Sequence, residues 1–169
     1  TDGTWSGTQF FSFVPNDTEG TEIPRGLTPG QQLMYFAGGN LSTAKLEPWR
    51  TDGTSAGTFM IKVLSDDRVY DSHIQLQTMT FDPLPDSLDF SPFFITNNDR
   101  VYFSGSDGIN GFELWTSDGV RDGPGTHLVK DLNPRHCNPD RYGLCSSFPE
   151  SFRLLGDKII FRADFGSDN

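Results

Sequence analysis

The chain has 169 residues, a net charge of -10, 34% hydrophobic residues, 18 glycines, 11 prolines and 15 phenylalanines. The negative charge argues against nucleic acid as a partner, because phosphates would repel it, and no run of about 18 apolar residues exists that could span a membrane. The length is enough for one domain with its own core, and the glycine, proline and phenylalanine content favours a turn-rich β protein over a helical one.

Short apolar segments separated by turns predict strands along the whole chain. The predicted strands fall into successive small antiparallel sheets, each of which we call a blade. Residues 1–14 are expected to form a turn and the last strand of a preceding blade. Residues 15–64 are expected to form a blade, in which a polar connector leads to strands at 33–36, 46–50 and 58–63.

Residues 65–92 interrupt this pattern with six aspartates and three prolines, so we expect an acidic insertion loop there. The next blade, residues 93–132, is predicted from strands at 93–96, 101–104, 112–117 and 126–132.

A cysteine-containing loop at residues 133–151 leads to the first half of a further blade at 152–169. Two apolar runs in that half, at 152–155 and 158–162, flank the pair Gly156-Asp157, which is a hairpin signal.

A motif of the form Glu-x-Trp-x-x-Asp-Gly recurs along the chain, in copies that are given at the end of this paragraph. Each copy is followed by Gly-Thr and then by an apolar run that ends near a lysine. A self-similar block of roughly fifty to sixty residues, rich in strands and turns, indicates a propeller or a repeat array. The copies are Leu46-Glu47-Pro48-Trp49-Arg50-Thr51-Asp52-Gly53-Thr54, Phe112-Glu113-Leu114-Trp115-Thr116-Ser117-Asp118-Gly119 and the opening Thr1-Asp2-Gly3-Thr4.

This pattern resembles the ELWxxDGT repeat family of large secreted or surface proteins, and the resemblance covers nearly the whole chain. The chain departs from the motif at Pro48, at Val120 and in a longer turn at 121–125. The resemblance implies an all-β fold, a β-propeller-like repeat of four-stranded antiparallel blades, with about three blades of a longer array present here.

The second strand of each expected blade is apolar at consecutive positions, at 33–36, 101–103 and 159–161. A strand of this kind must be covered on both faces. We therefore expect neighbouring blades to cover each other, since each large apolar side chain left in water would cost about 1.5–3 kcal/mol.

The recurring residues have two competing interpretations. We expect the tryptophans to be core residues between blades, with sugar-stacking platforms as the alternative. The Asp-Gly pairs are expected to be turns, in which the carboxylate caps backbone amides and glycine supplies the positive φ; one calcium ligand per blade is the alternative. The residues concerned are Trp49, Trp115, Asp2, Asp52, Asp118, Gly3, Gly53 and Gly119.

The recurring glutamates, Glu47 and Glu113, are expected to pair across strands with Lys62 and Lys130. Calcium, the one candidate cofactor, fits better on two acidic glycine-containing turns, because hard cations take oxygen ligands. The candidate ligands are Asp107, Asn110, Asp164 and Asp168.

Cys137 and Cys145 lie in one loop and are expected to form a local disulfide. Asn16 and Asn40 begin Asn-x-Ser/Thr triplets in predicted turns, so both are candidate glycosylation sites. Together these features favour an extracellular or cell-surface glycoprotein.

No catalytic residues are predicted, because His73, His127 and His136 have no nucleophile context. We expect a noncatalytic structural or adhesion protein whose loops contact extracellular proteins or glycans, and which packs against other copies of itself or further repeats, as in a filament or sheath. The alternatives are a calcium-dependent carbohydrate-binding module and, third, a propeller-type glycoside-processing enzyme.

Overall fold

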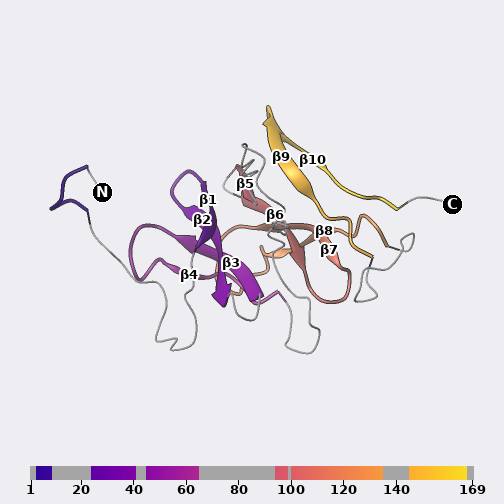
Figure 1. The fold of residues 1–169 in the computed structure, drawn as a ribbon, viewed down its shortest axis with the longest axis horizontal. Helices are drawn as coiled ribbons and strands as arrows, with labels where there is room; N and C mark the ends of the chain where they lie inside the picture. The colour runs from indigo at the N-terminus through magenta and orange to yellow at the C-terminus, as the bar shows by residue number, and fades with distance from the viewer. Residues whose placement is uncertain are drawn as a thin grey trace, which may run out of the picture.

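The computed structural model describes residues 3–8, 24–40, 45–64, 94–98, 100–134 and 145–166. Within these residues the protein is all-β, with ten strands in three antiparallel sheets and no helix (Figure 1). No helix in the described part is long and apolar enough to cross a membrane.

Each sheet is a meander in which neighbours in sequence are neighbours in space. The first sheet has the order β1-β2-β3-β4, the second β5-β6-β7-β8, and the third is the hairpin β9-β10. The strands are β1 (Arg25–Pro29), β2 (Met34–Asn40), β3 (Lys45–Thr51), β4 (Phe59–Met60), β5 (Phe94–Asn97), β6 (Arg100–Ser106), β7 (Phe112–Ser117), β8 (His127–Lys130), β9 (Glu150–Leu155) and β10 (Lys158–Arg162).

The first two sheets have the same strand register. Phe36 of β2 lies opposite Trp49 of β3, and Phe103 of β6 lies opposite Trp115 of β7. The sequence repeat is therefore also a repeat of strand pairing.

Burial of the second strands agrees with the consecutive apolar pattern. In β2 the side chains of Tyr35, Phe36 and Ala37 are all buried, and in β6 Val101 and Phe103 are fully buried. Successive residues of a strand point to opposite faces, so β2 is covered on both.

Adjacent sheets contact one another through their first strands. The Thr96 hydroxyl on β5 donates to the Pro29 carbonyl of β1 at 2.8 Å. The Asn97 amide on β5 donates to the Asp157 carbonyl, in the turn between β9 and β10, at 2.8 Å. The three first strands thus follow one another in chain order, β1 beside β5 and β5 beside β9.

The fourth strand of the first sheet is shorter than the predicted 58–63 because the chain after Met60 turns toward the second sheet. The Ile61 amide still donates to the Pro48 carbonyl at 2.8 Å, but the Ile61 carbonyl accepts from the Asp122 amide at 2.8 Å. The Lys62 ammonium donates to the Thr126 carbonyl at 3.2 Å. One sheet therefore ends by bonding to the turn of the next.

The predicted segments at 9–14 and 65–92 lie outside the described residues. Strand β1 was not predicted.

Candidate functional site

The Asp-Gly turns that follow β3 and β7 are built alike. Oδ1 of Asp52 accepts from the Thr54 amide at 2.9 Å, and Oδ1 of Asp118 accepts from the Val120 amide at 3.1 Å. The Thr54 hydroxyl also donates to Asp52 at 2.7 Å, and these hydrogen bonds lower the pKa of the Asp52 carboxyl. Both aspartates thus cap their own turns, as expected of turn residues.

The glycine after each aspartate has a positive φ, 89° at Gly53 and 75° at Gly119. A residue with a Cβ would be strained in this conformation. The Gly53 amide donates to the Thr51 hydroxyl at 2.9 Å, and the Gly119 amide donates to the Ser117 hydroxyl at 3.0 Å.

A buried pair of hydroxyl groups closes each turn. Thr51 and Thr58 are hydrogen bonded at 2.6 Å, and Ser117 and Thr126 at 2.7 Å. All four side chains are buried. The threonine of the recurring Gly-Thr therefore ties the fourth strand to the end of the third.

The glycine of Gly-Thr leaves room for the carboxylate of the aspartate. A Cβ at Gly57 would lie 2.0 Å from a carboxylate oxygen of Asp52, and a Cβ at Gly125 would lie 1.9 Å from one of Asp118. Real Cβ atoms do not approach other atoms this closely, so the carboxylate occupies the space that a larger residue would need. This contact explains why Asp-Gly and Gly-Thr recur together.

The opening turn repeats this geometry. The Gly7 amide donates to the Thr4 hydroxyl at 2.9 Å, and the Thr8 hydroxyl donates to the Thr4 carbonyl at 2.7 Å. The same two bonds, at 3.0 and 2.6 Å, are present in the 51–58 turn. Gly3 has a φ of 85°, which makes this the third turn of the same construction.

The recurring glutamates accept hydrogen bonds from backbone amides. The predicted cross-strand pair of Glu113 with Lys130 is wrong, because both carboxylate oxygens of Glu113 bind other donors. Its Oε2 accepts from the Leu132 amide at 2.9 Å and its Oε1 from the Ser147 amide at 2.9 Å, while the Ser147 hydroxyl also donates to it. Oε2 of Glu47 accepts from the Leu64 amide at 3.1 Å. Both carboxylates thus hold the chain that leaves the fourth strand.

Glu113 is fully buried, and burial raises the pKa of its carboxyl, while the hydrogen bonds from Ser147 and Leu132 lower it in part. A buried carboxylate of this kind is tolerated because each oxygen has donors. Ser147 belongs to the segment that leads to β9, so Glu113 connects the second sheet to the approach to the third.

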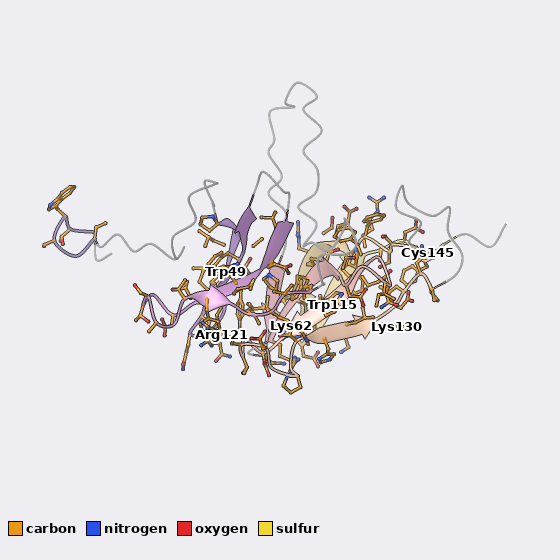
Figure 2. The ribbon with its side chains drawn as sticks, turned by 90° about the horizontal axis from the view of Figure 1, so that it is seen from below. Trp49, Lys62, Trp115, Arg121, Lys130 and Cys145 are labelled. Carbon is orange, nitrogen blue, oxygen red and sulfur yellow. The ribbon has the colours of Figure 1, made fainter. Side chains whose placement is uncertain are left out.

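Trp115 is a core residue, 6% exposed, and belongs to the main hydrophobic cluster (Figure 2). Trp49 is half-buried and stacks on Phe36, with ring centroids 6.1 Å apart. Gly38 and Gly105 make room for the two indoles, because a Cβ there would lie 2.9 and 3.2 Å from the respective rings. Neither indole is placed as an open sugar-binding platform.

The Asp107 turn uses its carboxylate internally. Oδ1 accepts from the amides of Ile109 and Asn110 at 2.9 and 2.8 Å, and Oδ2 accepts from the Asn110 side-chain amide at 2.7 Å. Oδ1 of Asp164 accepts from the Gly166 amide at 2.9 Å. In the described ranges no three His, Cys, Asp or Glu side chains gather in a group that could hold a metal ion.

Sequence reasoning missed a contact between the first two sheets. The guanidinium groups of Arg50 and Arg121 each lie 4.3 Å from the centroid of the Phe59 ring. Arg121 lies in the longer turn at 121–125 (Figure 2). Cation–π contacts at such distances are favourable by about 0.5–1 kcal/mol when exposed, and this one joins the turn of the second sheet to β4 of the first.

Of the predicted disulfide and glycosylation residues, Cys145 and Asn40 lie within the described ranges. Cys145 is half-buried at the start of the segment that contains Ser147, and its disulfide with Cys137 stays a prediction. Asn40 is the last residue of β2, and its side chain is not among those described. The predicted residues outside the described ranges are Asp2, Asn16, Cys137 and Asp168.

No protein-family model, curated protein or solved structure matches the chain.

Proposed function

We propose that the chain is a noncatalytic, extracellular scaffold, a β-propeller-like array that acts in surface structure or adhesion and presents its loops to proteins or glycans. The observation that carries this proposal is that the recurring polar side chains already serve the backbone. Asp52 and Asp118 cap turns, and Glu47 and Glu113 accept from amides at the end of the fourth strand. The recurrence of these aspartates and glutamates is explained by their hydrogen bonds to the backbone, without a bound ligand.

A propeller-like arrangement is supported by the order of the first strands. In a propeller the first strand of each blade lies nearest the axis, so first strands of successive blades are neighbours. Here β1 lies beside β5, and β5 beside β9. The resemblance to the ELWxxDGT family is part of the proposal, since the same motif residues form equivalent turns in both four-stranded sheets.

Extracellular location rests on the two sequons and on the expected disulfide between Cys137 and Cys145. The net charge of -10 favours partners that are neutral or basic over acidic ones. The partners we propose are extracellular proteins or glycans and further repeats of the same kind.

The adhesion role is tested by presenting the purified chain on beads to panels of extracellular proteins and glycans, with calcium and with a chelator. We expect retention that is equal in both conditions, because the Asp107 carboxylate is already hydrogen bonded within its turn. Asp107→Asn, which keeps a capping oxygen, serves as the matched variant.

Two results would contradict the proposal. Glycan binding that disappears with the chelator and in Asp107→Asn would favour the calcium-dependent carbohydrate-binding module. Hydrolysis of a glycoside that one carboxylate substitution abolishes would favour the enzyme.

A further inference from the structure

The third sheet has two strands in the described part of the chain, and β10 occupies the place of β6. Arg100 pairs with Asn97 at the hairpin end of β6, and Lys158 pairs with Leu155 at the hairpin end of β10. Counted from these pairs, Phe161 takes the place of Phe103. In the second sheet the other edge of β6 pairs with β7, the Glu-x-Trp strand.

Equivalent positions differ in burial. Val101 of β6 is fully buried, while Ile159, its counterpart in β10, is only half-buried and Ile160 is 51% exposed. Exposed apolar side chains that lie together can mark an interaction site, whereas single ones are common on protein surfaces. Within the described residues β10 pairs with β9 alone, whereas β6 pairs with both β5 and β7, and the burial of the two strands differs in the same sense.

The basic residue at the start of the second strand shows the same difference. Arg100 donates to the Thr116 hydroxyl at 3.2 Å and to the Gly125 carbonyl at 2.7 Å, so it holds the third strand and the turn after it. Lys158 is exposed, and among the described residues its ammonium pairs with the carboxylate of the adjacent Asp157, at 3.2 Å. A positive charge thus remains at the place where a third strand would end.

Strand β8 has an equivalent open side. Met60 pairs with Trp49 as Leu128 pairs with Trp115, so Val129 takes the place of Ile61. Ile61 is fully buried, and its carbonyl accepts from the amide of the next sheet's turn, at Asp122. Val129, in contrast, is 44% exposed.

Lys130 also differs from its counterpart in the first sheet. Its counterpart Lys62 donates to the Thr126 carbonyl in the turn of the following sheet, whereas the Lys130 side chain is exposed (Figure 2). Positions equivalent to Ile61 and Lys62 are therefore present on β8, while the described part of the third sheet has no turn equivalent to the one that Ile61 and Lys62 contact.

We propose that these positions, Val129, Lys130, Lys158, Ile160 and Phe161, form an acceptor site along β8 and β10 for one extended strand-turn segment of the Glu-x-Trp…Asp-Gly type. The strand of that segment pairs with β10, its tryptophan lies opposite Phe161, and its turn meets Val129 and Lys130. The acidic residues of the motif complement the two lysines.

The segment must come from a repeat that is not already folded into a sheet. A second copy of this chain has both of its Glu-x-Trp strands, β3 and β7, paired on either side, so it cannot donate one without unfolding. This inference rests on the repeat architecture within the proposed function, and not on adhesion.

The experiment uses the full chain and a fluorescein-labelled peptide with the sequence of residues 110–132, which contains the third strand, turn and fourth strand of the second sheet. Fluorescence anisotropy measures binding. We expect saturable binding that weakens at least about tenfold in the peptide carrying Trp115→Ala, a change that does not affect folding of the receptor chain.

On the receptor, Val129→Asn and Ile160→Asn should each weaken binding by a similar factor. Ile109→Asn, an exposed residue in the Asp107 turn, is the matched control and should leave binding unchanged. Equal binding of both peptides, or no binding, would overturn the proposal. Concentration-dependent dimerisation that the peptide does not inhibit would identify a second copy as the occupant and would overturn it too. None of these results depends on the adhesion panel, so the two proposals fail separately.

Discussion

The contact between Asp118 and Gly125 gives the sharpest test of how the repeat is built. A Cβ at Gly125 would lie 1.9 Å from a carboxylate oxygen of Asp118, so Gly125→Ala must push the carboxylate out of its place. The backbone itself does not oppose alanine, since Gly125 does not have a positive φ. The whole cost should therefore come from the side chain of Asp118.

The magnitude follows from two effects. Overpacking by one methyl group costs about 1–3 kcal/mol, and loss of the hydrogen bond from the Val120 amide to Asp118 costs about 0.5–1.5 kcal/mol. In an Asp118→Ala background the steric overlap is gone, and alanine at 125 also reduces the entropy of the unfolded chain by about 0.4–1 kcal/mol. We expect Gly125→Ala to be neutral or stabilising in that background.

The assay is urea unfolding of the wild type, both single variants and the double variant, with the free energies compared in a double-mutant cycle. A coupling energy of about 1 kcal/mol or more is expected. Asp52 and Gly57, with a corresponding distance of 2.0 Å, form the matched pair and should give the same sign. Additive free energies in both cycles would refute the explanation of why Gly-Thr recurs.

Three further outcomes are expected. Burial raises the pKa of the Glu113 carboxyl, so the native state binds more protons than the unfolded state at pH values between the ordinary glutamate pKa of about 4.3 and the raised native pKa. The contribution of Glu113 to the free energy of unfolding should therefore fall as pH rises through this range. Urea unfolding measured across pH should show this fall in the wild type and not in Glu113→Gln. Trp115→Ala should destabilise by about 3–5 kcal/mol, and a change below about 0.5 kcal/mol in the same assay would place the indole on the surface. Peptide mapping without reductant should recover Cys137 and Cys145 in one linked fragment; two alkylatable thiols would contradict this.

The strands that carry the repeat were predictable because their signals are local. The apolar runs and the Asp-Gly turn place β7 and β10 at Phe112–Ser117 and Lys158–Arg162, the predicted bounds. Strand β1 was missed because Gly26 and Pro29 oppose strand formation locally. Its partner β2 supplies the pairing, with a register irregularity between Arg25 and Thr28 that includes Gly26.

The turn aspartates of the candidate site were predictable, but their contact with a glycine several residues later was not. The role of Glu113 was wrongly predicted because its donors, the Leu132 amide and the amide and hydroxyl of Ser147, lie 19 and 34 residues further along the chain, and no sequence signal links them to the glutamate. The Phe59 contact with two arginines could not be found from the repeat, since the counterparts of Arg50 and Phe59 in the second sheet are Thr116 and His127.

Successive sheets are held side by side by contacts of their repeat turns. The amide of Asp122 tests this packing most directly, because this residue lies in an exposed turn of the second sheet while its N–H donates to the Ile61 carbonyl of the first at 2.8 Å. Amide hydrogen exchange, followed residue by residue by NMR, should show Asp122 protected to the same degree as amides inside β6 and β7. Exchange at the rate of an unprotected turn, with those strands still protected, would show that the sheets do not pack as described.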